Sequence, residues 1–218
     1  MHALTIARPE PYVWVSWISK LLAGEASCVW SAWLRAHYQT AKPPNGTFDM
    51  GRWQMDHSAL LRKAVADHEK KEYKVYTEGQ NLFALKGKSG TLSGKPDVVA
   101  VKNAMGWVVD TKTGSPKASD RIQVMLYMWA LPKTNPAFAG VTFEGKVSYK
   151  CCYNLITPDE IDAVFVQRVA ELMKEICGDN EPHKAPSFGE CQYCPVTGKD
   201  CTDRVETERA YQGVTEEF

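Results

Sequence analysis

The sequence has no excess of charge of either sign. Its 26 Lys and Arg residues balance 26 Asp and Glu residues, so the formal net charge is zero. This balance excludes a global field that would draw in a polyanion, and any such attraction would have to be local. Internal repeats and low-complexity tracts are also missing, which argues against repeat architectures and compositionally disordered chains.

Long hydrophobic runs are missing as well. No apolar stretch is long enough to span a bilayer as a helix, and the first residues lack the basic start and apolar run of a secretory signal. We therefore expect a cytoplasmic protein without membrane contact. The seven cysteines do not suit a disulfide framework in that compartment, so they need another role.

Length and composition allow a sizeable core. A chain of 218 residues with 44% hydrophobic residues can form one large domain, or a core with a small appendage. Alternating helical and strand-like segments predict an α/β fold. Helices are expected over residues 16–38, with a break at Gly24, and over 49–71. A third helix is expected to start near residue 119, and a fourth to run from the capping pattern at 157–160 to 177. Strands are expected over 73–76, 81–85, 98–101, 107–112 and 141–154.

The densest group of chemically capable residues lies in residues 94–127. Asp97 sits in a strand-like run that continues over 98–101, the turn at 103–106 reverses the chain, and a second strand carries Asp110-Thr111-Lys112. Residues two apart on a strand share a face, so Asp110 and Lys112 point the same way and Thr111 points away. The hairpin is expected to bring Asp97 back beside that pair.

Two carboxylates and an ammonium group at one sheet end suit metal-assisted chemistry. Carboxylate oxygens bind hard cations such as Mg²⁺ and Mn²⁺. A neighbouring lysine can orient a water molecule or neutralise charge that grows on a phosphate. On the helix that follows, Gln123 and Tyr127 lie four residues apart on one face.

A second pattern occupies the C-terminal part of the chain. Cys191 and Cys194 form a C-x-x-C, and Cys201 follows after six residues. Three close cysteines favour a zinc or iron–sulfur site and need a fourth ligand. His183 is the local candidate for a zinc site, and Cys28 is a distant one. We interpret Cys151 and Cys152 as small, buried or half-buried strand residues.

The spacing of the first pattern resembles the PD-(D/E)XK nuclease superfamily. Pro96-Asp97 matches its PD half, Asp110-Thr111-Lys112 matches the D-x-K half with 12 residues between the two aspartates, and Gln123 and Tyr127 match the Q-x-x-x-Y of the RecB-like branch. The resemblance implies that His57, on a helix before the PD strand, binds the metal ion with Asp97, Asp110 and the Thr111 carbonyl. It also suggests Glu78 as an accessory residue, although an exposed glutamate is an equal interpretation.

The cysteine pattern resembles a narrower branch, the iron–sulfur RecB-like nucleases. These include the CRISPR adaptation exonuclease and the nuclease domain of AddB-type helicase–nucleases, and the resemblance covers the chain from about Ser16 to Cys201. It implies that Cys28, Cys191, Cys194 and Cys201 hold a [4Fe–4S] cluster. The sequence departs from the pattern of this branch at Asp110, where the branch often has glutamate.

The sequence therefore predicts one nuclease domain over 1–218. We expect a restriction-endonuclease-like core over about 48–177, with a small mixed sheet flanked by helices, and a helical iron–sulfur subdomain from residues 16–40 and 183–211. The resemblance implies a Mn²⁺- or Mg²⁺-dependent exonuclease on single-stranded DNA ends, acting in CRISPR spacer acquisition with integrase proteins or in DNA processing by a mobile element. Oligomerisation stays open. The alternatives are a non-catalytic DNA-binding adaptor and a zinc-bound endonuclease.

Overall fold

The fold is built around a five-stranded mixed sheet. We describe it from a computed structural model that covers residues 6–39 and 49–208. The strand order is β10-β9-β8-β7-β4, and only the β8–β9 pair is parallel. The strands are β4 (Lys74–Thr77), β7 (Val98–Lys102), β8 (Met105–Lys112), β9 (Thr142–Tyr149) and β10 (Tyr153–Ile156).

The β7–β8 hairpin is tighter than predicted. Lys102 pairs with Met105, so only Asn103 and Ala104 form the turn. Asn103 has φ of +57°, a left-handed conformation that asparagine tolerates better than most residues. Strand β8 therefore begins two residues before the predicted start at Trp107.

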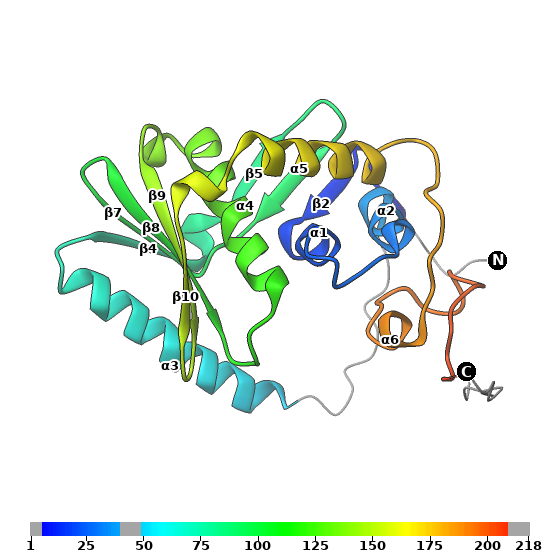
Figure 1. The fold of residues 1–218 in the computed structure, drawn as a ribbon, viewed down its shortest axis with the longest axis horizontal. Coiled ribbons are helices and arrows are strands. Elements are labelled where there is room, and N and C mark those ends of the chain that lie inside the picture. Colours follow the sequence, from blue (N-terminus) through cyan, green and yellow to red (C-terminus); the bar gives the residue numbers. More distant parts are fainter. Residues whose placement is uncertain (1–5, 40–48, 209–218) are drawn as a thin grey trace, which may run out of the picture.

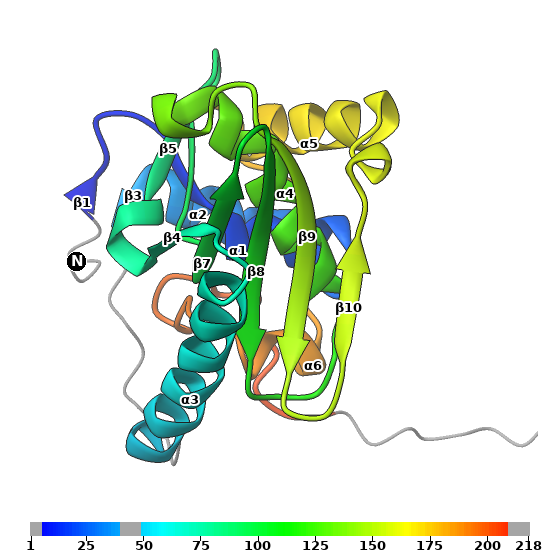
Figure 2. The same ribbon diagram turned by 90° about the vertical axis from the view of Figure 1, so that its left-hand side faces the viewer.

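Helices cover both faces of this sheet. Helix α3 (Met50–Glu69) contacts β4, β7 and β8, and α4 (Ala118–Thr134) contacts β8 and β9. Figure 2 shows α3 in front of the sheet and α4 behind it. Since α4 connects the parallel strands β8 and β9, it is a crossover helix, the connection that parallel neighbours require.

The alternation of buried residues fixes which side chains face which helix. Val98 and Val109 pack with Ala64 of α3, whereas Val99 and Val108 belong to the larger core with Val124 of α4. By the two-residue period of a strand, Thr111 shares the α3 side with Val109. Asp110 and Lys112 share the α4 side with Val108.

A second, three-stranded sheet has the order β2-β6-β5 and holds the N-terminal part against the core. Its strand β6 was not predicted, because a Thr-Leu-Ser-Gly segment has no clear strand pattern. A two-stranded sheet pairs β1 with β3. The strands are β1 (Ile6–Ala7), β2 (Tyr12–Trp14), β3 (Tyr38–Gln39), β5 (Phe83–Lys86) and β6 (Thr91–Gly94).

The N-terminal helices and the C-terminal segment lie side by side at one end of the molecule (Figure 1). Gly24, with φ of +71°, separates the first two helices as predicted. The first helix begins at Val15, one residue before the predicted start, and Trp14 is its N-cap. The helices are α1 (Val15–Leu22), α2 (Val29–His37), α5 (Ala163–Ile176) and α6 (Phe188–Cys191), with 3₁₀ turns η1 (Glu78–Asn81), η2 (Pro136–Phe138) and η3 (Pro158–Glu160).

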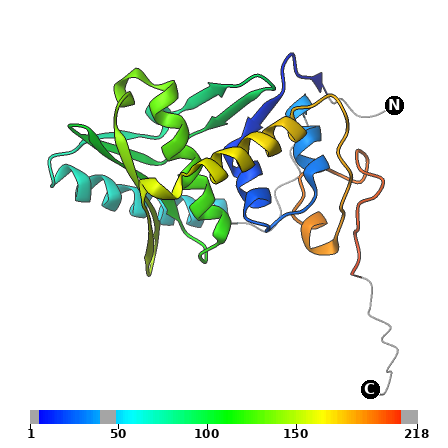
Figure 3. The ribbon, with the colours of Figure 1, turned by 45° about the horizontal axis from the view of Figure 1, so that its top comes forward.

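Helix α5 passes over α1 and α2 and contacts both (Figure 3). The predicted helix start at 157–160 does have a capping box, but it caps only η3. Helix α5 starts separately, where the Asp162 carboxylate accepts a hydrogen bond from Phe165 N. The prediction was wrong here because a capping box marks a first turn and does not guarantee that the helix continues.

The predicted strand over 141–154 is two strands joined by a turn. Cys151 and Cys152 lie in that turn and are exposed, so their interpretation as buried or half-buried strand residues was wrong. The turn was missed because it contains no glycine or proline. The predicted boundaries 1–218, 16–40, 48–177 and 183–211 each include residues outside the described part of the chain.

The mixed α/β architecture agrees with the predicted fold class. Within residues 6–39 and 49–208, no helix is both long and apolar enough to cross a membrane.

Candidate active site

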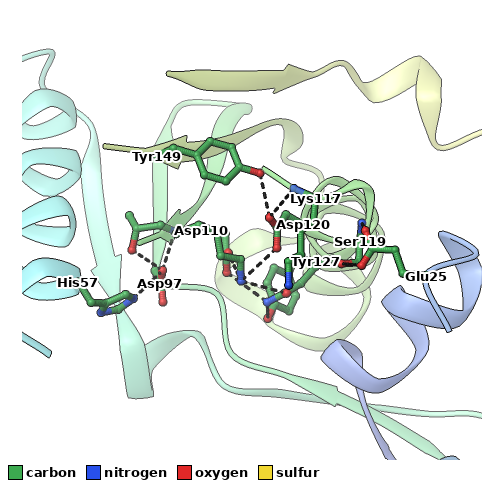
Figure 4. Close-up of polar contacts among 12 residues, drawn as sticks. Glu25, His57, Asp97, Asp110, Lys117, Ser119, Asp120, Tyr127 and Tyr149 are labelled. Carbon is green, nitrogen blue, oxygen red and sulfur yellow. Dashed lines mark hydrogen bonds and ion pairs between the residues drawn. The ribbon is translucent and has the colours of Figure 1, made fainter. Parts of the chain in front are cut away.

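The first half of the site lies on the α3 side of the sheet. The Asp97 Oδ2 atom accepts hydrogen bonds from the Thr111 backbone N–H and hydroxyl, both at 2.7 Å. His57 Nε2 lies 3.2 Å from the same oxygen. Figure 4 shows His57 reaching Asp97 from α3.

The second half lies on the α4 side and is centred on Lys112. Its Nζ atom is 2.8 Å from Asp110 Oδ2 and donates to Gln123 Oε1 at 3.1 Å. The Gln123 amide nitrogen lies 3.3 Å from Asp110 Oδ1 and donates to the Tyr127 hydroxyl at 2.8 Å. Gln123 of the predicted Q-x-x-x-Y therefore contacts both residues of the predicted Asp-x-Lys pair directly, and Tyr127 contacts Gln123.

The Asp97 carboxylate has a different partner from the one expected. The sequence predicted that Asp97 would join Asp110 and Lys112 while Thr111 pointed away. In the structure Thr111 does face the opposite side from Asp110, but the Asp97 carboxylate is bound there by the Thr111 hydroxyl. Asp97 precedes β7 rather than forming part of it, so the strand period does not govern its direction.

The two halves still influence each other electrostatically. Burial raises the pKa of Asp110 to about 6, with Lys112 opposing the shift and the charge of Asp97 adding to it. Burial works to raise the pKa of Asp97, but hydrogen bonds from His57 and Thr111 lower it below its usual value. The hydrogen bond to Asp97 raises the pKa of His57.

Lys112 and Tyr127 keep their protons. Burial works to lower the pKa of Lys112, but the carboxylate of Asp110 beside it raises that pKa overall. Burial raises the pKa of the Tyr127 hydroxyl well above its usual value. The site thus offers one fixed positive charge among carboxylates.

The donor chemistry at this site fits a divalent cation. Asp110 is only 3% exposed, and its Oδ2 atom contacts Lys112 Nζ but receives no well-formed hydrogen bond. A buried carboxylate oxygen that keeps a lone pair without a hydrogen bond is a natural ligand for a hard cation. Across the described residues, however, no three His, Cys, Asp or Glu side chains are placed together as a ready metal site.

Glu78 lies at the edge of the first half. Its backbone N–H donates to the Asp97 carbonyl at 3.1 Å, and its charge contributes to the raised pKa of His57. Its φ of +44° is unusual for a glutamate. An accessory role for Glu78 stays a prediction.

Two polar residues of the second half were not predicted. Asp120, in the first turn of α4, accepts hydrogen bonds from the Tyr149 hydroxyl at 2.9 Å and from Lys117 N at 3.1 Å. Its other oxygen lies 3.9 Å from Lys112 Nζ. The sequence signals Asp120 only as an acidic residue in a first helical turn, and nothing in the sequence signals Tyr149.

The N-terminal end of α4 is also held from outside. Glu25, between α1 and α2, accepts hydrogen bonds from Ser119 N at 2.8 Å and from the Ser119 hydroxyl at 2.5 Å. Figure 4 shows Glu25 on the far side of Ser119 from Asp120. A second carboxylate, Glu190, accepts from Ser27 N, the Ser27 hydroxyl and Cys28 N at 2.5, 2.8 and 3.3 Å.

The four cysteines of the predicted cluster line one cavity of about 690 Å³; they are Cys28, Cys191, Cys194 and Cys201. His183, the local alternative, is not among the lining residues. The Cys194 sulfur lies 3.2 Å from the Ser31 hydroxyl. The described part of the chain holds no closed cysteine metal site, so the cluster itself is not shown.

The buried carboxylates and the ammonium group of this constellation suit metal-assisted chemistry, and comparison with known proteins gives the family. Residues 18–198 match the PD-(D/E)XK nuclease superfamily, so the chain belongs to that superfamily of nucleases. No curated protein matches it. A solved structure described as "Crystal structure of SSO0001" is similar at 16% identity over 87% of this chain and 85% of that one, with a TM-score of 0.46.

Proposed function

We propose that this nuclease hydrolyses DNA phosphodiester bonds with Mn²⁺ or Mg²⁺, as an exonuclease on single-stranded ends. The observation that carries the proposal is the buried pair of Asp110 and Lys112, with an Asp110 oxygen that lacks a hydrogen bond. A buried, anionic oxygen beside a fixed ammonium group is suited to metal-assisted phosphate chemistry and is otherwise costly.

Each residue has a role in this proposal. His57, Asp97, Asp110 and the Thr111 carbonyl would hold the cation, which supplies Lewis-acid stabilisation and a more acidic bound water. Lys112 orients the attacking water or neutralises charge on the phosphate. Gln123 holds Lys112 and Asp110 in register, and Tyr127 holds Gln123.

The remaining cofactor proposal concerns the cysteine-lined cavity. We propose that Cys28, Cys191, Cys194 and Cys201 hold a [4Fe–4S] cluster with a structural role. Support comes from their positions: one cysteine precedes the nuclease core, three follow it, and all four line the same cavity. That centre would then join residues 16–40 to residues 183–211, the two parts of the predicted iron–sulfur subdomain, on either side of the core of 48–177 in the sequence.

The biological setting is proposed from the sequence resemblance alone. It favours CRISPR spacer acquisition beside integrase proteins, or DNA processing by a mobile element, in the cytoplasm. Single-stranded ends as substrate have the same support.

The test compares the wild type with Asp110→Ala on an end-labelled single-stranded oligonucleotide with Mn²⁺. We expect Asp110→Ala to abolish cleavage with its fold and metal content at the cysteines retained, because it removes a proposed cation ligand and a partner of Lys112 without changing the hydrophobic core. A matched Lys112→Ala variant should lose orders of magnitude in rate but keep most of its Mn²⁺ affinity. Wild-type rates in Asp110→Ala would overturn the site, and DNA binding without any wild-type cleavage would favour the adaptor alternative.

A further inference from the structure

Asp120 is a carboxylate that no part of the proposed mechanism uses. It is buried, at 8% exposure, in the first turn of α4. Both hydrogen bonds to it end on the same oxygen, Oδ2, which accepts from Tyr149 on β9 and from Lys117 N. Two donors on one oxygen fix the plane of the carboxylate and direct the other oxygen, Oδ1.

That free oxygen faces the catalytic lysine. Asp120 Oδ1 lies 3.9 Å from Lys112 Nζ, so the ammonium group contacts two carboxylates from two different elements, Asp110 on β8 and Asp120 on α4. Gln123 adds a third contact from α4 at 3.1 Å. Figure 4 shows the Tyr149 hydroxyl pointing toward Asp120.

We infer that Asp120, fixed by Tyr149, is a positioning residue that holds the Lys112 ammonium in place for the reaction; this rests on the proposed function. Asp110 has two tasks in that function, as partner of Lys112 and as cation ligand. A carboxylate that binds a cation attracts a neighbouring ammonium group less. Asp120 is tied to Tyr149 and Lys117 instead, so its hold on Lys112 does not change when Asp110 is engaged.

The competing explanation is purely structural. Asp120 also closes the capping box of α4 through Lys117 N, and losing a cap alone destabilises a helix. The chain offers a matched control for this, because Glu25 binds the same end of α4 through Ser119 and forms neither a hydrogen bond nor an ion pair with Lys112. Changing either carboxylate to its amide removes one anion from the same helix end.

The experiment measures kcat and KM on the single-stranded oligonucleotide, and the melting temperature, for Asp120→Asn, Tyr149→Phe and Glu25→Gln. We expect Asp120→Asn to lower kcat about 10- to 100-fold, the scale of a misplaced catalytic group, with KM unchanged. Tyr149→Phe should lower kcat by less. Glu25→Gln should lower the melting temperature as much as Asp120→Asn does and leave kcat near wild type.

Coupling to Lys112 gives the second readout. If Asp120 acts through Lys112, then Asp120→Asn has no further effect on the residual rate of Lys112→Ala, whereas independent effects would multiply. Multiplying effects, a wild-type kcat in Asp120→Asn, or an equal kcat loss in Glu25→Gln overturns the inference. A wild-type rate in Asp110→Ala is a different outcome, because it overturns the proposed function itself.

Discussion

At the scale of single residues, Asp110 is placed where an anion is costly. It is 3% exposed, and burial raises its pKa to about 6 despite the nearby Lys112. Asp97 has the opposite shift, because hydrogen bonds from His57 and Thr111 more than offset its burial. The pKa values of these two carboxylates are therefore shifted in opposite directions, an arrangement typical of functional sites.

The shift of Asp110 predicts that the site lowers the stability of the protein at neutral pH. An unfolded aspartate titrates near pH 4, so the contribution of the raised folded pKa is fully present below about pH 4 and is lost as the pH rises through about 6. We expect Asp110→Asn, without added divalent metal, to melt roughly 2–4 °C above the wild type at neutral pH, which is the scale of a change of about 1 kcal/mol in a chain of this size.

The control is the same comparison at acidic pH. As the pH falls through about 6 the wild-type carboxyl takes up its proton, so the advantage of Asp110→Asn should shrink. Differential scanning calorimetry at both pH values checks this. A variant that melts below the wild type at neutral pH would show that the ion pair with Lys112 outweighs the burial of the carboxylate.

At the scale of elements, the site depends on how closely α4 approaches the sheet. A Cβ atom on Gly145 of β9 would lie 2.7 Å from Val124 Cγ1 and 2.6 Å from Met128 Sδ, both on α4. Real Cβ contacts are not this short, so only glycine allows the helix to lie where it does. The neighbouring residue on α4 is Gln123, which contacts Asp110 and Lys112.

Gly145→Ala should therefore move α4 and weaken the site. We expect a loss of about 1–3 kcal/mol in the free energy of unfolding, the usual cost of overpacking a core, together with a reduced cleavage rate. Gly114→Ala is the control, since a Cβ atom there would meet nothing within 4 Å. Urea denaturation of both variants decides it, and equal midpoints would mean that α4 does not need this close approach.

The elements also show how far the sequence could be interpreted. Strand period alone placed Asp110 and Lys112 on one face, and helical spacing placed Gln123 and Tyr127 together, because both are local regularities. The binding of Asp97 by Thr111 and of Asp120 by Tyr149 could not be predicted, since each joins residues whose distance depends on tertiary packing. Cys151 and Cys152 were misplaced because their turn has no characteristic turn residues.

At the scale of the whole molecule, two carboxylates connect the N-terminal loop to distant parts. Glu25 binds the start of α4, and Glu190, next to Cys191, binds Ser27 and Cys28. The loop between α1 and α2 is therefore held at one end to α4 and at the other to the cysteine-rich segment. A cross-link between Cys28 and Cys191 would close a loop of 163 positions.

This arrangement makes Cys28 the decisive test of the cluster proposal. We expect Cys28→Ala to lose most of its iron and visible absorbance and to become unstable, because the C-terminal segment is no longer joined to the N-terminal helices. Iron per chain and the absorbance spectrum are measured on protein purified without air.

Cys177→Ala is the matched control. Cys177 is buried at the end of α5 and does not line the cavity with the other four cysteines. It should keep both iron and colour. Full iron content in Cys28→Ala would show that another residue is the fourth ligand. Stoichiometric zinc in a colourless wild type would favour the zinc alternative.

The chain order of these parts has a consequence for synthesis. All proposed catalytic side chains from Asp97 to Tyr127, and the β8–α4–β9 unit that carries most of them, are complete once Tyr149 has been made. The three C-terminal cysteines emerge from the ribosome after that unit, and domains tend to fold as they emerge. A newly made chain therefore contains its proposed catalytic residues before the segment that would join its N-terminal helices, and any machinery that loads the cysteines would act on a chain in which those residues are already present.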